Sequence, residues 1–195
     1  MPASERIITA ADIIPDAEFR AQRSERRREL LPRKKLRRIE VGPVCTFYFE
    51  TFDTMLFQVQ EMLAIEKGGA EQLKDELAAY NPMIPQGSEL TATIMFEIDD
   101  PKRRASILSR LGGVEDCFFL QIGTERIAAE PEGDVERTDE SGKSSSVHFV
   151  HFKLKPEPLA LFRDRAYRSL AGVDAALWAC RLSPATRAAT GDSFS

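Results

Sequence analysis

Strand-like segments follow one another directly at two places in this sequence, with no room for a helix between them. The segments LRRIEVG (36–42) and VCTFYFET (44–51) are joined by a Gly-Pro turn signal. Later, CFFLQIGTERIAAEP (117–131) has the pattern of two strands, and VHFVHFKL (147–154) that of a third. Strands joined by short turns pair antiparallel, because parallel strands need long crossovers. We therefore predict a single α+β domain with a mostly antiparallel sheet and helices packed on one face.

The segments between these strands have the spacing of amphipathic helices. In 53–67, apolar residues recur at helical intervals, and Gly68-Gly69 is a stop signal. Asp100 followed by Pro101 is typical of a helix start, and Pro32 is predicted to end a helix that begins near Asp16. The predicted helices span 16–31, 53–67, 70–80, 100–112 and 156–172, and ELTATIMFEID (89–99) is the clearest strand.

Length and composition favour one ordinary folded domain. With 195 residues, 43% of them hydrophobic, the chain can bury a normal core without metal or disulfide. We expect a helical basic arm over 1–34 packed on an α+β domain over 35–188, with a loose tail over 189–195. The cysteines, Cys45, Cys117 and Cys180, form no C-x-x-C pair, so we expect reduced thiols and no metal site. The absence of a signal-like or long apolar segment predicts a cytoplasmic protein with no membrane association.

Positive charge is concentrated near the N-terminus, although the formal net charge is −4. Ten basic residues fall between positions 20 and 38, namely Arg20, Arg23, Arg26, Arg27, Arg28, Arg33, Lys34, Lys35, Arg37 and Arg38, against two glutamates. This run is either a solvated helix face or an anion-binding or nucleotide-binding arm, in which Arg37 and Arg38 reach a phosphate. Nucleic-acid binding is disfavoured, because no aromatic residues are interleaved with the charges.

The stretch FYFETFDTMLFQVQEMLAIEKGG (47–69) carries the main candidate site. Glu50 ends an aromatic strand, and apolar neighbours raise the pKa of a carboxyl group. Gln58 and Gln60 flank the core position Val59, so at least one amide lies near the buried stripe and needs partners. Glu50 and Glu61 together could serve as acid and base or hold a divalent metal. The alternative is that these polar residues form only the solvated face of a helix.

The two histidines, His148 and His151, lie on a predicted strand and therefore point to opposite faces. This spacing disfavours a metal site that uses both. One of them is a candidate proton carrier in a pocket, and the polar company of SSSVH favours His148.

Several long motifs resemble one bacterial family. They are LPRKKLRRIEVGP, the 47–69 stretch, ELAAYNPMIPQGSELTATIMFEIDDP, LSRLGGVEDCFFLQIG, KSSSVHFVHF and LSPATRAA, and they span about Thr9 to Ala188. Together they look like the family known as domain of unknown function 3501. That family has no established activity. The resemblance adds weight to Gln58, Glu61, Tyr80 and Asn81 as a shared surface. It also implies a redox setting, because genes of the family tend to lie near those of rubrerythrin-like proteins and iron–sulfur oxidoreductases.

Two functions follow as expectations. The first is a binding or accessory protein that contacts a redox-enzyme partner through its sheet and basic arm. The second is an enzyme with a small pocket between the 53–67 helix and the sheet, acting on a phosphorylated or metal-bound ligand. Its candidate catalytic residues are Glu50, Glu61 and His148, and its candidate ligand-binding residues are Arg37, Arg38, Gln58, Tyr80 and Asn81. The sequence leaves enzymatic activity, cofactor and oligomeric state open.

Overall fold

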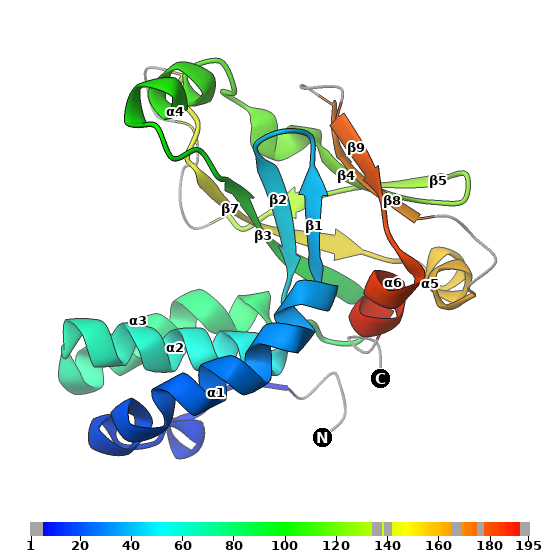
Figure 1. Ribbon diagram of the computed structural model, residues 1–195. Coiled ribbons are helices and arrows are strands. Elements are labelled where there is room, and N and C mark those ends of the chain that lie inside the picture. The colour runs from blue at the N-terminus through cyan, green and yellow to red at the C-terminus, as the bar shows by residue number, and fades with distance from the viewer. Residues whose placement is uncertain (1–5, 134–137, 139–141, 165–168, 175–177, 192–195) are drawn as a thin grey trace.

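Two antiparallel sheets form the body of the protein in a computed structural model that describes residues 6–133, 138, 142–164, 169–174 and 178–191 (Figure 1). The five-stranded sheet has the order β1 (Arg38–Val41), β2 (Cys45–Phe49), β3 (Glu89–Phe96), β7 (Val147–Lys153) and β6 (Glu130–Pro131). The four-stranded sheet has the order β5 (Glu125–Ala128), β4 (Phe118–Ile122), β8 (Ser169–Val173) and β9 (Trp178–Arg181). The predicted α+β class and antiparallel pairing are confirmed. The strands divide into two sheets, where the sequence predicted one.

The main core lies between these sheets, because alternate residues of each strand point inward. On β2, Cys45, Phe47 and Phe49 are at most 2% exposed. The ring of Phe47 stacks on Phe152 of β7 and meets Phe118 of β4 edge to face, at centroid distances of 6.4 and 5.8 Å. The opposite face of the five-stranded sheet is therefore free to carry polar groups.

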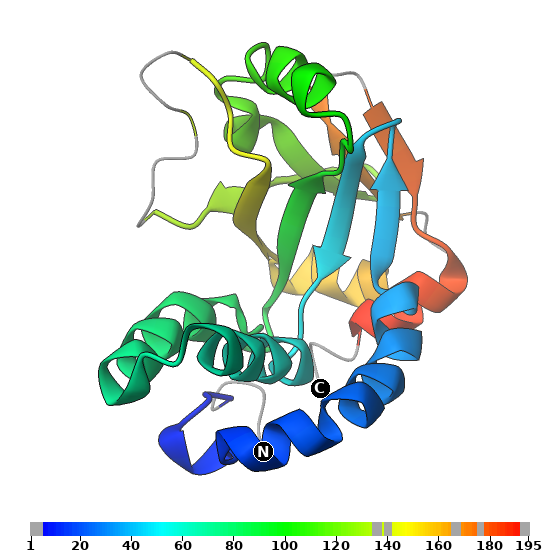
Figure 2. The same ribbon diagram turned by 60° about the vertical axis from the view of Figure 1, so that its left-hand side comes forward.

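Three helices form a layer across one end of this sheet: α1 (Asp16–Leu36), α2 (Phe52–Glu66) and α3 (Gly69–Tyr80) (Figures 1 and 2). They enclose a second apolar cluster around Met55, Val59 and Met83, and Phe149 of β7 packs against it. The shorter helices are α4 (Pro101–Leu108), α5 (Pro156–Arg163) and α6 (Pro184–Gly191). The helical layer is thus joined to the outer face of the sheet without covering all of it.

Helix α1 continues past Pro32, so the prediction that this proline ends the helix is wrong. Proline removes the hydrogen bond to the carbonyl of residue 28 and crowds that carbonyl, but Arg28 is exposed, so water can satisfy the carbonyl. The helix follows a curved path in Figure 2. It is anchored to α2 by contacts such as that of Phe19 with Phe57, whose rings lie 5.8 Å apart.

The second half of the predicted 156–172 helix is also different. Helix α5 ends at Arg163, and Ser169–Val173 form β8, which pairs with β4 and β9. Ala171 and Val173 are fully buried there. The helical spacing that extended to Leu170 is overridden because β4 needs a partner on its second edge. At the chain end, α6 extends into the predicted tail, and residues 192–195 lie outside the described part.

Cys45 and Cys117 are free thiols, and the side chain of Cys180 lies outside the described part. Burial raises the pKa of Cys45 to about 12, so this thiol is unreactive.

Among the described helices, none combines the length and apolar character needed to cross a membrane.

Candidate functional site

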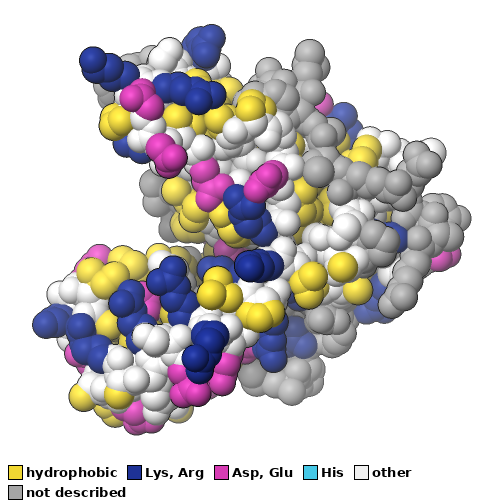
Figure 3. Space-filling model, in the orientation of Figure 1, with side chains coloured by type: hydrophobic (Ala, Val, Ile, Leu, Met, Phe, Trp, Pro, Cys, Tyr) yellow, Lys and Arg dark blue, Asp and Glu magenta, His cyan; other side chains and the backbone are white. Residues whose placement is uncertain are grey.

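A cleft separates the outer face of the five-stranded sheet from helices α2 and α3, and Figure 3 shows the hollow on this side of the molecule. It contains a cavity of about 440 Å³, which we call the cleft pocket. The sheet contributes Tyr48, Thr93 and Phe149 to its lining, and the helices contribute Met55, Gln58 and Tyr80. Glu50 and Lys34 also line it. The predicted convergence of the aromatic strand and the glutamine-bearing helix therefore occurs here.

Glu50 reaches this pocket because it lies where β2 becomes α2. It is the next outward-facing position after Tyr48, and its backbone N–H donates to the carbonyl of Thr91 at 2.9 Å, which extends the ladder. Thr51 then caps α2, and its side chain accepts from the N–H of Thr54 at 3.2 Å. The strand end and the cap fix the direction in which the Glu50 side chain leaves the backbone.

Two threonine hydroxyls hold the Glu50 carboxylate. Thr93 Oγ1 donates to Oε1 and Thr54 Oγ1 donates to Oε2, each at 2.6 Å. Glu50 is only 6% exposed. Within the described part of the chain it forms no ion pair. The carboxylate is thus held by neutral donors and is not ion-paired within the described residues, although Lys34 lines the same pocket.

Aromatic and sulfur-containing side chains form the walls around this carboxylate. The rings of Tyr80 and Phe149 meet edge to face with centroids 6.4 Å apart. Burial raises the pKa of Tyr80, and a hydrogen bond with Gln58 partly opposes that rise. Tyr80 therefore keeps its proton at neutral pH. The pocket combines the carboxylate of Glu50 and the ammonium group of Lys34 with flat, polarisable surfaces.

A polar network on β1, β2 and the end of β3 borders the pocket. Arg38 Nε donates to the hydroxyl of Tyr48 at 3.0 Å, and Tyr48 donates in turn to Glu97 at 2.6 Å. Burial opposes ionisation of Glu97, but hydrogen bonds from Thr46, Tyr48 and Arg38 hold its pKa below the ordinary value. This network keeps the Tyr48 ring in place as one wall of the pocket.

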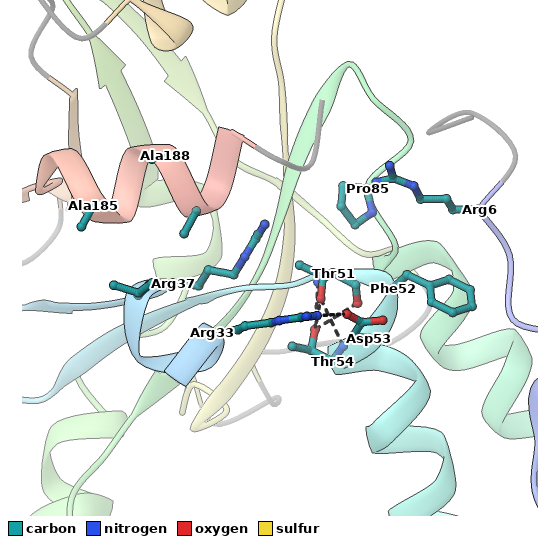
Figure 4. Close-up of a pocket in the computed structure, with 12 residues that line it drawn as sticks. Arg6, Arg33, Arg37, Thr51, Phe52, Asp53, Thr54, Pro85, Ala185 and Ala188 are labelled. Carbon is teal, nitrogen blue, oxygen red and sulfur yellow. Dashed lines mark hydrogen bonds and ion pairs between the residues drawn. The ribbon is translucent and has the colours of Figure 1, made fainter. Parts of the chain in front are cut away.

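A larger cavity of about 780 Å³ lies between α1, α6 and the start of α2 (Figure 4). Arg6, Arg33 and Arg37 line it, and Arg33 extends toward Asp53, with which it pairs at 2.6 Å. Arg37 is 5% exposed, and its Nη1 donates to the backbone carbonyl of Glu50 at 3.4 Å. Arg37 therefore supports the backbone that carries Glu50 and does not line the cleft pocket.

Three other predicted site residues lie elsewhere. Glu61 is bound by Arg23 through two bonds of 2.6 Å, and about 10 Å of helix rise separates it from Thr54. Asn81 pairs with both backbone groups of Ile8, at 2.8 and 3.0 Å. His148 is fully buried between the sheets against Phe96 and Phe118. Glu61 and Asn81 therefore make contacts that hold the helical layer together. His148 is part of the core.

The structure therefore brings together Glu50, Gln58 and Tyr80, with Arg38 at the border. Gln60, the other amide of the helix, is 5% exposed and pairs with the backbone of Ile14 at 2.9 and 3.3 Å, which confirms the expectation of a buried amide with partners.

Sequence reasoning missed Thr54, Thr93, Phe149 and Lys34 as pocket residues. The available signal was the alternation of β3 and β7, which places Thr93 and Phe149 on the outward face. Among the described residues, no cluster of three or more acidic, histidine or cysteine side chains could hold a metal.

Comparisons with known proteins identify the family of the chain. A search of curated proteins finds no match. The crystal structure of a "novel protein of unknown function" from Burkholderia pseudomallei K96243 is 30% identical, with a TM-score of 0.87, and the match covers 96% of this chain and 99% of that one. The model of the family described as "protein of unknown function (DUF3501)" matches residues 7–186. The chain therefore belongs to the DUF3501 family, as the sequence motifs indicated.

Proposed function

We propose that this protein binds a small organic molecule through the cleft pocket, and that a protonated amine or similar cationic donor of the ligand pairs with Glu50. The observation that carries this proposal is the state of Glu50: a buried carboxylate, 6% exposed, that borders a cavity and is held by two neutral hydroxyls. An ionised carboxylate offers about four lone-pair sites, and the two threonines use two of them. The remaining sites are available to a ligand.

The environment strengthens such an interaction. A hydrogen bond to a charged group is worth about 1.5–3 kcal/mol, roughly twice a neutral one, and water competes less in a half-enclosed pocket. A cation near an aromatic ring face gains a further ~0.5–2 kcal/mol. Tyr48, Tyr80 and Phe149 supply such rings around the cavity. The walls thus suit a ligand with an apolar or flat body as well as a positive group.

The pocket bears differently on the two functions expected from the sequence, an enzyme and a partner of a redox enzyme. The enzyme hypothesis would retain Glu50 as the acid or base of the pocket, without Glu61 or His148 beside it. The association with a redox enzyme receives no support from the comparisons or from the described residues, and it stays a prediction. The binding function rests only on the geometry of the pocket.

The test uses a matched pair of probes, phenethylamine and phenethyl alcohol, which share a body and differ in charge. We expect calorimetry and thermal-shift measurements to detect the amine and not the alcohol, since a ligand at 100 times its Kd stabilises by about 2.7 kcal/mol. Glu50→Gln should weaken amine binding at least about tenfold. The control variant Glu125→Gln removes an exposed acid on β5 and should bind as the unmodified protein does. Equal binding by Glu50→Gln, or binding of neither probe, would refute the proposal.

A further inference from the structure

A smaller cavity of about 210 Å³ lies next to the cleft pocket, on the side of α1. Lys34 and Tyr48 line both cavities, so the two lie side by side. The smaller cavity is lined by Arg27, Lys35 and Arg38 in addition, with Leu30, Leu31 and Phe57 as its apolar part. No acidic side chain lines it in the described structure. We call it the cationic pocket.

Most of the α1 cations outside the cationic pocket form ion pairs, and Arg26 is the exception among the described residues. Arg20 and Arg33 are paired with Asp16 and Asp53. Arg38, at the edge of the cationic pocket, is occupied by Glu40 and Glu97.

By contrast, Arg27, Lys34 and Lys35 form no ion pair with any described residue. Figure 3 shows basic side chains gathered over this helix. The cationic pocket therefore gathers three cations that form no ion pair with a described residue, next to the cleft pocket that holds Glu50.

The two pockets together present opposite charges to one ligand. We propose that the natural ligand is amphoteric: its cationic group pairs with Glu50, and an acidic group, a carboxylate or a phosphate, is held by Arg27, Lys34 and Lys35. This inference rests on the proposed function and narrows its ligand class. Lys34 has a special position, because it lines both cavities and is only partly exposed. Of the three cations, it is therefore the one nearest the amine-binding part of the site.

The experiment compares three probes on the full chain by calorimetry: phenethylamine, benzoate and para-(aminoethyl)benzoate, which combines both charged groups on the same ring. A fourth probe, tyramine O-phosphate, carries a phosphate in place of the carboxylate and is compared with phenethylamine. We expect the combined probes to bind at least about tenfold more tightly than either single-charge probe. The gain should fall as salt rises, because the lysines are near solvent. The tighter of the two combined probes distinguishes a carboxylate from a phosphate ligand.

Variants locate the acidic group. The double variant of Arg27→Gln with Lys35→Gln should reduce the gain of the combined probe while leaving the affinity for phenethylamine within about twofold, because neither residue lines the cleft pocket. The triple variant with Lys34→Gln added should abolish the gain, measured against phenethylamine on the same variant. Lys102→Gln removes an exposed lysine on α4 and is the matched control. Circular dichroism verifies that each variant is folded.

The outcomes separate the two proposals. If phenethylamine binds through Glu50 and the added acid brings no gain, the amphoteric ligand is wrong and the proposed function stands. If the gain survives in the triple variant, the acidic group binds elsewhere and the inference is likewise overturned. If no probe binds, both proposals fail.

Discussion

Replacing Thr93 with valine removes one of the two hydroxyl donors to Glu50 and preserves the shape of the side chain. Thr93 lies on the central strand β3, and its hydroxyl donates to Glu50 Oε1 at 2.6 Å. Both residues are at most 6% exposed, so water cannot replace the lost donor without reorganisation. Thr54 is a less suitable target, because its hydroxyl also takes part in the cap of α2.

The size of the expected change in the free energy of unfolding follows from the charge of the Glu50 carboxylate, which accepts the hydrogen bond. Leaving a buried carboxylate oxygen without its donor costs about 1–3 kcal/mol, and the extra methyl group returns about 0.8 kcal/mol of burial. The methyl term is the same whichever residue occupies position 50, so a double-mutant cycle with Glu50→Gln cancels it. Hydrogen bonds to charged acceptors are worth about 1.5–3 kcal/mol and those to neutral ones about 0.5–1.5. The expected coupling between Thr93 and Glu50 is therefore about 1 kcal/mol.

The assay is urea unfolding of the four proteins of the cycle near neutral pH, with linear extrapolation of the free energy of unfolding. For a chain of this size, 1 kcal/mol corresponds to about 2–4 °C in Tm, so thermal scans provide a second readout. Thr124→Val, at an exposed turn position, is the control and should stay within about 0.5 kcal/mol of the unmodified protein. A coupling indistinguishable from zero would refute the inference that Thr93 supports a charged Glu50.

Two further predictions concern other parts of the structure. Phe47→Ala should lower the free energy of unfolding by about 3–5 kcal/mol in the same urea assay, because Phe47 is fully buried between the sheets, and a loss below about 1 kcal/mol would contradict that position. His151 lies 2.9 Å from Glu89 and 2.7 Å from Glu132, and the hydrogen bond with Glu89, followed by that with Glu132, raises its pKa. Its contribution is present below the ordinary pKa of about 6.5 and is lost as pH rises through the raised value, so His151→Gln should destabilise by about 1–2 kcal/mol near pH 6 and by less near pH 9. If the loss of stability in His151→Gln does not change with pH, the charged imidazole of His151 is not what links Glu89 on β3 to Glu132 after β6.

Local sequence patterns were sufficient to place one half of the site. The alternation of β2 orients Tyr48 and Glu50 outward, and the amphipathic pattern of α2 puts Gln58 near the sheet. The other half depends on strand register. In the register of β2 with β3, Tyr48 lies opposite Thr93, so Glu50 reaches Thr93 diagonally across the pair. Register is set by turns and core packing over more than forty residues, and no short window of sequence contains it.

The incorrect predictions have the same origin. Pro32 has a strong local preference to end a helix, but packing of α1 on α2 extends the helix beyond it. The apolar spacing up to Leu170 suits a helix, yet the free edge of β4 takes up Ser169–Val173 as a strand. In both cases tertiary contacts outweigh a propensity of a few kcal/mol at most.

The environment of Glu50 indicates why a carboxylate there serves binding more than stability. Removing a carboxylate from water costs several kcal/mol even after relaxation, and two hydroxyl donors return about 3–6 kcal/mol of that. A glutamine at position 50 would avoid the desolvation of a charge and retain one acceptor for a threonine hydroxyl. We therefore expect Glu50→Gln, measured as a single variant of the same cycle, to be at least as stable as the unmodified protein while it loses amine binding. A large loss of stability would show instead that the charge holds the junction of β2 and α2 together, and Glu50 would then be a structural residue beside an incidental cavity.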